Sequence, residues 1–228
     1  MSGQTVAVVV AHPDDEVLAF GGTICRHVEA GDEVRVLFLA TGLSARDNEG
    51  GAPESAALET LRKEAKAAGD ILGVPAMEFC DFPDNRMDTV ALLDIVKRIS
   101  RFLEQTAASV VYTHHDGDLN IDHSLTARAV ITASRPVPGS TIRRIYAGEI
   151  LSSSEYSLAQ HRFRPTTYVG IEPFIDRKRA ALQCYTGEVR YWPHPRSIKA
   201  VALLARLRGS ECGLEAAEAL SLLREVQP

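Results

Sequence analysis

The amino-acid sequence predicts an α/β protein in which a parallel β-sheet is flanked by helices and the C-terminal third is mostly helical. Apolar runs rich in β-branched residues, at 6–11 and 34–40, are typical of strands buried on both faces. Segments with a helical apolar period separate such runs. Strands that alternate with helices favour a parallel sheet with right-handed crossovers, an arrangement that is Rossmann-like.

The other elements follow from composition and spacing. The helix expected at 20–30 ends at Gly31, and the Ala-, Leu-, Lys- and Glu-rich helix at 54–72 ends at Gly73. The polar, Gly-rich stretch at 41–53 predicts a mobile loop. Further strands are expected at residues 77–79, 109–113, 142–147 and 167–171. Further helices are expected at residues 88–104, 122–134, 173–185, 198–207 and 214–226.

Composition and charge limit the class of protein. The 228 residues are 45% hydrophobic and 24% charged, as in a soluble globular protein, and we expect one domain over residues 1–228. The net charge of -5 disfavours a nucleic-acid partner, which would favour a basic surface. No secretory signal is recognisable, and no window reaches the ~18 apolar residues of a membrane span. The four cysteines form no C-x-x-C pair, so a cytoplasmic protein with reduced thiols is expected.

Two clusters of histidine and carboxylate side chains follow two of the predicted strands. The first is AHPDDE, residues 11–16, at the end of the strand at 6–11. The second is THHDGDLNIDH, residues 113–123, at the end of the strand at 109–113. Ligands of open α/β sheets bind outside the carboxyl ends of the strands, so both clusters belong to one functional edge. Such crowding of acids is costly unless a cation or protons neutralise it.

These clusters predict a zinc site made of His12, Asp15 and His123. Imidazole suits zinc, whereas magnesium prefers oxygen ligands. His12 and Asp15 turn toward one point if the loop between them is tight, and Pro13 would stiffen that loop. Gly21–Gly22 would let the start of a helix pack close to it. Two histidines and one carboxylate with an open fourth position make a recognised catalytic zinc arrangement.

With these motifs in view, the chain resembles the LmbE-like, or PIG-L, family of zinc-dependent N-deacetylases over nearly its whole length. The strongest element of the resemblance is AHPDDE with the two glycines behind it. Further matches are Thr41–Gly42, RKEAKAAGDILGV at 62–74, FPDN at 82–85, NIDH at 120–123 and, for one large branch of the family, HPRSIKAVALLARLRGSECGLEAAEA at 194–219.

The resemblance implies roles for single residues. His12, Asp15 and His123 match the metal ligands of the family. Asp14 matches its general base, and Asp122 matches an acid that orients a neighbouring catalytic group. Zinc would lower the pKa of bound water to about 7. Asp14 would take the proton from this water as it attacks the acyl carbonyl.

Four further residues complete the candidate site. Arg62 and Asp84 fall where family members contact the sugar, although Arg62 also fits a solvent-facing helix position and Asp84 a turn former. The family's second motif is His-x-Asp-His, and here its first position is Asn120. Asparagine delivers no proton at neutral pH, but its amide donates a hydrogen bond. His194 is therefore expected to supply the acid or oxyanion donor. In the alternative, Asn120 is the donor and Asp14 makes both proton transfers.

The implied reaction is hydrolysis of an N-acyl amide. The implied substrate is a small-molecule amino sugar of N-acetylglucosamine type, free or in a glycoconjugate. The main alternative is a zinc amidase that acts on a non-sugar amide. A magnesium-dependent phospho-receiver also carries paired acids after its first strand, but this sequence has no P-loop or G-x-G-x-x-G. A non-catalytic binder would not need Asp14. The oligomeric state stays open, with a homo-oligomer among the alternatives.

Overall fold

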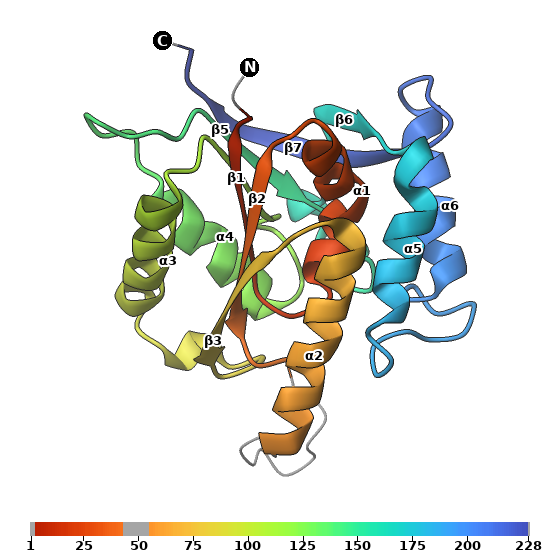
Figure 1. Cartoon of the computed structure of the whole chain (residues 1–228), viewed down its shortest axis with the longest axis horizontal. Helices are drawn as coiled ribbons and strands as arrows, with labels where there is room; N and C mark the ends of the chain where they lie inside the picture. The colour runs from red at the N-terminus through yellow and green to blue at the C-terminus, as the bar shows by residue number, and fades with distance from the viewer. Residues whose placement is uncertain (1–2, 43–54, 228) are drawn as a thin grey trace.

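The computed structural model describes residues 3–42 and 55–227, and within them seven strands form one mixed β-sheet. The spatial order of the strands is β3-β2-β1-β4-β5-β7-β6. Their bounds are Thr5–Val10 for β1, Glu33–Ala40 for β2, Ala76–Phe82 for β3, Val110–His114 for β4, Arg144–Gly148 for β5, Thr167–Gly170 for β6 and Ala217–Glu225 for β7. Figure 1 shows the sheet in the middle of the molecule with helices on both sides. The predicted α/β class is confirmed.

Helices cover both faces of the sheet (Figure 1). One face carries α1 (Asp15–Glu29), α2 (Ser55–Leu72), α5 (Ile175–Gln183) and α6 (Ile198–Ser210), and the other carries α3 (Leu92–Thr106) and α4 (Ile121–Ala133). Short 3₁₀ turns lie at Met87–Thr89, Ser154–Tyr156, Ala159–His161 and Glu172–Phe174. Strand β1 is parallel to both of its neighbours, β2 and β4, so the chain returns to the sheet through helices.

The sheet separates two apolar cores. Along β1, Val6, Val8 and Val10 belong to the core under α1, α2 and α5. Ala7 and Val9 belong to the core under α3 and α4. All five side chains are fully buried. Burial of a valine side chain stabilises a fold by about 1.5–3 kcal/mol, so a strand that is apolar on both faces belongs in the middle of the sheet.

The C-terminal segment differs from the prediction. Residues 217–225 form strand β7, so the helix expected at 214–226 is wrong. Strand β7 runs antiparallel between β5 and β6, and the sheet is mixed rather than fully parallel. Alanine, leucine and glutamate are among the best helix formers, but this preference is small for each residue, and pairing along both edges of β7 outweighs it. The helices expected at 173–185 and 198–207 are confirmed as α5 and α6.

Helix α1 begins earlier than predicted. It starts at Asp15 rather than at residue 20. The backbone carbonyl of Asp14 accepts the N–H groups of Val17 and Leu18 at 3.0 and 2.9 Å, which places the first helical turn inside the acidic motif. The loop expected at 41–53 lies outside the described residues from residue 43 onward.

Gly21 and Gly22 have a packing role that differs from the predicted one. A Cβ atom at Gly21 would lie 3.0 Å from Cγ of Lys178 on α5. A Cβ atom at Gly22 would lie 2.5 Å from the side chain of Ile171. Close-packed interiors leave no room for such contacts. The two glycines therefore let α5 and the segment before it pack closely against α1. The predicted role was close packing of the helix start against the loop after β1.

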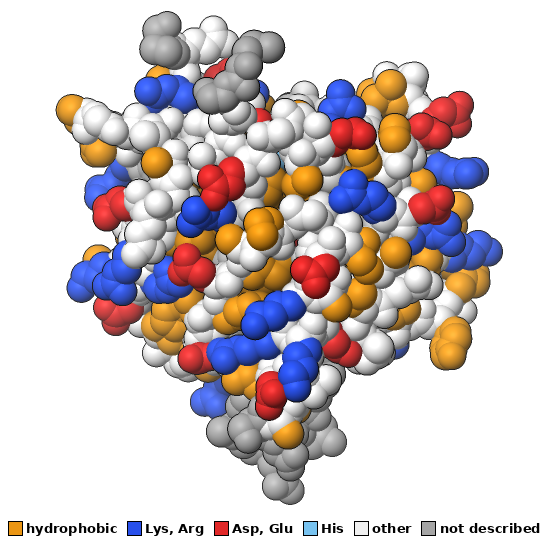
Figure 2. All heavy atoms as spheres, in the orientation of Figure 1, with side chains coloured by type: hydrophobic (Ala, Val, Ile, Leu, Met, Phe, Trp, Pro, Cys, Tyr) orange, Lys and Arg blue, Asp and Glu red, His pale blue; other side chains and the backbone are white. Residues whose placement is uncertain are grey.

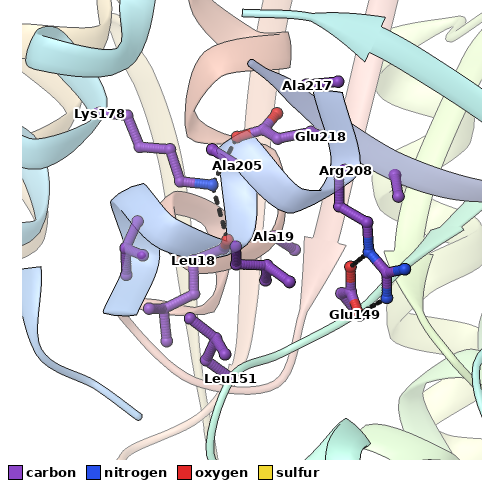
Figure 3. A pocket seen from close by; sticks show the side chains of 12 residues that line it. Leu18, Ala19, Glu149, Leu151, Lys178, Ala205, Arg208, Ala217 and Glu218 are labelled. Atoms are coloured by element: carbon purple, nitrogen blue, oxygen red, sulfur yellow. Dashed lines mark hydrogen bonds and ion pairs between the residues drawn. The ribbon is translucent and has the colours of Figure 1, made fainter. Parts of the chain in front are cut away.

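A buried ion pair fixes α1 against this layer (Figure 3). Nζ of Lys178 donates to the carbonyl oxygen of Leu18 at 2.8 Å and to Glu218 Oε1 at 2.6 Å. Glu218 Oε1 accepts the N–H of Gly22 at 2.8 Å, and Oε2 accepts that of Thr23 at 2.7 Å. A buried charge pair needs such additional hydrogen bonds to offset its desolvation. Helix α1 is therefore held in place one to two turns after its start.

The surface shows no separation of charge on the face drawn in Figure 2. Acidic side chains lie among the basic ones, with apolar side chains between them. Among the helices in the described ranges, none combines the length and the apolar character needed to cross a lipid bilayer.

Candidate metal centre and active site

His12, Asp15 and His123 lie together in the interior, beyond the carboxyl ends of β1 and β4. Asp15 Oδ2 is 3.3 Å from His12 Nδ1 and 3.4 Å from His123 Nε2. The two ring nitrogens are 3.3 Å apart. One ligand atom from each side chain lies within 4.8 Å of the others, and all three residues are buried. The structure thus brings together the three residues expected to hold a metal.

The topology of the sheet explains this meeting. Strands β1 and β4 are adjacent and parallel, so the segments that follow them leave the sheet at one edge. His123 lies in the first turn of α4, and Asp15 is the first residue of α1. Asp14, between His12 and the helix, has φ 115° and ψ -27°. This left-handed conformation costs about 1–3 kcal/mol for a residue other than glycine. It closes a turn in which the N–H of His12 donates to Asp15 Oδ2 at 2.8 Å.

The donor atoms fit a divalent metal ion. Asp15 Oδ1 is buried and has no hydrogen-bond partner in the described part of the chain. His123 Nδ1 lies 3.1 Å from Asp118 Oδ1, so a neutral ring donates through Nδ1 and presents the lone pair of Nε2 to Asp15. His12 likewise directs Nε2 to carboxylates, which leaves the lone pair of Nδ1 facing the cluster. Three sets of lone pairs converge here, and a cation removes their repulsion.

The acidic surroundings favour positive charge at this point. Burial lowers the pKa of His123, but the charge of Asp15 and the hydrogen bond to Asp118 outweigh burial and raise the pKa to about 9. Burial also opposes the charged form of His12, yet hydrogen bonds to carboxylates, first of all that of Asp122, raise its pKa well above the usual value. A bound metal would replace these protons, because imidazole ligates metals in its neutral form.

Asp118 supports His123, and the sequence prediction missed it. Asp118 also accepts hydrogen bonds from the hydroxyl groups of Ser153 and Ser154 and from the N–H of Asn120. Burial raises the pKa of Asp118, but the hydrogen bonds from His123 and the two serines outweigh burial and lower it to about 2. A carboxylate that orients a metal-binding histidine is a common feature of metal sites. In the sequence, the one signal for this role of Asp118 was its position five residues before His123.

Asp84 and Asp122 lie at the other nitrogen of His12. His12 Nε2 is 2.9 Å from Asp84 Oδ1 and 3.1 Å from Asp122 Oδ2. Asp122 also accepts the backbone N–H groups of Asn85 at 2.6 Å and Met87 at 3.0 Å, so it fixes the turn that carries Asp84. These three side chains form a second group that could hold a metal. If Nε2–H of His12 donates to these two carboxylates, the lone pair of Nδ1 remains for the group of His12, Asp15 and His123. We therefore assign to Asp84 and Asp122 the role of orienting the His12 ring.

Asp14 lines a cavity of about 230 Å³ next to the group of His12, Asp15 and His123. Burial raises the pKa of Asp14 to about 7, although the charge of Arg196 acts in the opposite direction. A carboxylate with this pKa is suited to accept a proton near neutral pH. The cavity is also lined by His12, Pro13, Gly42, Asp84, Asn85 and Asn120, and by Glu188, Arg190 and Arg196 of the C-terminal third.

Asn120 lines the same cavity and caps α4. Its Oδ1 accepts the N–H of Asp122 at 2.9 Å, and its Nδ2 donates to Asn85 Oδ1 at 3.0 Å. The carbonyl side of the amide is therefore used for the helix cap, and the NH₂ side is the one that can serve a substrate. This is the orientation required if Asn120 is a hydrogen-bond donor.

His194 and Arg62 are not brought to the cavity. His194 is exposed, and its Nδ1 accepts the backbone N–H of Arg196 at 3.0 Å. The ring of His194 is not among the side chains that line the cavity, and the turn directs Arg196 inward instead. Arg62 donates to Asp81 Oδ1 at 2.6 Å and lies 5.6 Å from the ring centroid of Phe79. Its position fits a helix-surface residue. Arg196 itself was not singled out from the sequence.

His114 is a structural histidine at the end of β4. It is fully buried, and its Nε2 accepts the backbone N–H of Ala11 at 2.8 Å. Its ring stacks on that of His123 with 4.1 Å between the centroids. Burial lowers the pKa of His114 to about 3, so the ring is neutral. His114 therefore supports the ring of His123 without adding charge.

Fold and site together define an α/β protein with a buried cluster of two histidines and one carboxylate at the carboxyl edge of its sheet. Residues 7–134 match the PIG-L family, described as GlcNAc-PI de-N-acetylase. This chain belongs to that family, as the motifs at residues 11–16 and 120–123 predicted.

Known relatives include a hydratase as well as deacetylases. A 4-oxalmesaconate hydratase from Pseudomonas putida is 30% identical over 84% of this chain and 76% of its own length. A probable N-acetyl-alpha-D-glucosaminyl L-malate deacetylase 2 from Bacillus anthracis is 24% identical over 80% of each chain. The solved structure of the 4-carboxy-2-hydroxymuconate hydratase from Pseudomonas putida KT2440 has a TM-score of 0.80 and 27% identity, and the match covers 99% of this chain and 98% of that one. Relatives of this chain are thus enzymes of two reaction types.

Proposed function

We propose that this protein is a zinc-dependent hydrolase that removes an N-acetyl or other short N-acyl group from an amino sugar of N-acetylglucosamine type, free or within a glycoconjugate. The observation that carries the proposal is the position of Asp14 beside the cluster of His12, Asp15 and His123, on a cavity that Asp14 and His12 both line. The description of the family and the similarity to a probable deacetylase support the sugar substrate.

The reaction divides its tasks among the metal cluster, Asp14 and Asn120. His12, Asp15 and His123 would hold the zinc ion, which supplies Lewis-acid activation of water when bound. Asp14 accepts a proton from the water that attacks the acyl carbon. The carboxyl group of Asp14 then returns this proton to the departing nitrogen, so that a short acid and a free amine are released. Nδ2 of Asn120 donates a hydrogen bond to the oxygen that gains negative charge.

Two carboxylates support this arrangement. Asp122 orients His12 through Nε2 and holds the turn of residues 84–87. Asp84 lines the cavity and is the residue that we propose to contact a sugar hydroxyl. Arg62 is left out of the substrate-binding set because it pairs with Asp81 away from the cavity lining.

A hydratase is the second candidate, because the relative with 30% identity is named as one. Addition of water to a carbon–carbon double bond also requires a base that takes a proton from water, and Asp14 fits this task equally well. The two reactions differ in the bond that changes. Hydrolysis breaks a C–N bond and releases an acid, whereas hydration forms C–O and C–H bonds and releases nothing.

A panel of substrates separates these functions. Zinc-loaded protein is incubated with N-acetylglucosamine, its glycosides, N-acetylated non-sugar amines and an unsaturated dicarboxylate. Acetate release is measured for the amides, and loss of ultraviolet absorbance for the dicarboxylate. We expect acetate from the amino sugars, and release that is about 10²–10⁴-fold slower from the matched Asp14→Asn variant. Acetate from non-sugar amides alone would indicate an amidase, and hydration without acetate release would replace the proposal by a hydratase.

A further inference from the structure

Arg196 joins the C-terminal third of the chain to the candidate active site. Its Nη1 donates to Asp14 Oδ2 at 3.0 Å and to Glu188 Oε2 at 2.9 Å. Its Nε donates to Ser152 Oγ at 2.8 Å. Arg196 and Asp14 are 182 residues apart in the sequence. The guanidinium group thus has three polar partners, and two of them carry negative charge.

The backbone on both sides of Arg196 is fixed. The N–H of Arg196 donates to His194 Nδ1 at 3.0 Å, and its carbonyl oxygen accepts the N–H of Arg190 at 3.3 Å. The next residue, Ser197, is the N-cap of α6 and accepts the N–H of Ala200 at 3.1 Å. A side chain that leaves a fixed backbone and has several polar partners holds its geometry well. His194 therefore contributes to the site by supporting Arg196.

Arg196 controls one of the two oxygens of Asp14. Oδ2 accepts the hydrogen bond from Nη1, and no residue in the described ranges hydrogen-bonds to Oδ1. We propose that Arg196 is the positioning residue of Asp14: the ion pair holds the carboxylate with Oδ1 available to the water that attacks the substrate. This inference rests on the proposed function, because it takes Asp14 to be the base.

The chemistry of the guanidinium group suits this task. Arginine is planar and directs several N–H groups at carboxylates, whereas lysine is a point charge without this geometry. A direct role in binding an anionic substrate fits less well, because Glu188 and Asp14 already balance the charge of Arg196. A shift of about 1 Å in a catalytic group lowers the rate by roughly 10²-fold, and we expect a loss of this order when the ion pair is removed.

The test compares the variants Arg196→Ala and Arg196→Lys with Arg206→Ala, a matched control from the exposed side of α6. For each protein, kcat, KM and zinc content are measured on the best N-acetylated amino sugar, with and without millimolar guanidinium chloride. We expect Arg196→Ala to lose about 10²-fold in kcat, with KM and zinc content close to wild type. Arg196→Lys should keep part of the activity. Guanidinium should restore part of the kcat of Arg196→Ala and should not raise that of Arg206→Ala or Asp14→Asn.

Three results would overturn the inference while the proposed function stands. These are an unchanged kcat in Arg196→Ala, a loss confined to KM, and a loss of kcat that neither guanidinium nor the lysine variant restores. Loss of zinc from Arg196→Ala would likewise show that the residue acts on the metal cluster rather than on Asp14. If wild-type protein released no acetate from any substrate, the proposed function would fail, and this role of Arg196 would fail with it.

Discussion

The metal side and the C-terminal side of the cavity differ in origin. The metal side is built from two short segments, residues 12–15 and 118–123, which follow the adjacent strands β1 and β4. The C-terminal side contributes Glu188, Arg190 and Arg196 from the connection between α5 and α6. The metal ligands are buried, whereas Arg190 is exposed and Arg196 is partly exposed.

This difference separates two tasks. The metal side takes its geometry from the register of neighbouring parallel strands, and each ligand has a carboxylate or a backbone group behind it. The C-terminal side depends on one ion pair that joins Arg196 to Asp14. Substitutions of the proposed metal ligands and of the groups behind them should therefore reduce metal binding, and substitutions of Asp14 or of the C-terminal side should reduce turnover with the metal in place.

The largest effect is expected from the metal ligands. Wild-type protein should carry about one zinc ion per chain, and His12→Ala or His123→Ala should lose both the metal and the activity, because two ligands form an incomplete site. Elemental analysis after removal of free metal, together with an activity assay in chelator, checks this. Full activity in chelator with no bound transition metal would contradict the metal site altogether.

The variant Asp14→Asn tests whether metal binding and turnover depend on different residues. Asp14→Asn should keep zinc but lose about 10²–10⁴-fold in turnover, because it removes a general base and leaves the ligands intact. Zinc content and kcat are measured on the same preparation. If this variant kept a rate close to wild type, another group would have to be the base.

A substitution at Asp118 tests whether the carboxylate behind His123 contributes to metal binding. Asp118→Asn should weaken zinc affinity by about 10–100-fold, because it removes the carboxylate that orients His123. Competition with a chromogenic chelator measures this affinity. Asp116→Asn is the matched control, since the Asp116 side chain is 79% exposed. Equal zinc affinity in the two variants would show that the contact between Asp118 and His123 does not support the metal.

The smallest effect is expected from His194. His194→Ala removes one hydrogen bond to the backbone of Arg196, worth about 0.5–1.5 kcal/mol, so kcat should fall by at most about tenfold. Arg196→Ala should fall further, since it removes the ion pair itself. Steady-state kinetics on both variants makes this comparison. A loss in His194→Ala larger than that in Arg196→Ala would restore the acid role that the sequence predicted for His194.

The sequence prediction was most successful where chemistry and local pattern coincide. The apolar runs marked the strands, and AHPDDE marked the turn between β1 and α1. The meeting of His12, Asp15 and His123 followed because parallel strands end at one edge. The residue type of His194 suggested that it is the catalytic acid. The direction in which a side chain leaves a turn, however, is not determined by the neighbouring residues alone. The chain there turns Arg196 toward Asp14 instead.

The sequence by itself determined the α/β class, membership of the PIG-L family and the grouping of His12, Asp15 and His123, because these depend on periodicity and on motifs of a few residues. Only the tertiary structure decided that residues 217–225 form a strand, that Ser153 and Ser154 hold Asp118, and that Arg196 holds Asp14. The physical reason is the same in each case. A contact across many residues depends on how whole elements pack, and sheet pairing or a buried ion pair outweighs the weak preferences of single residues.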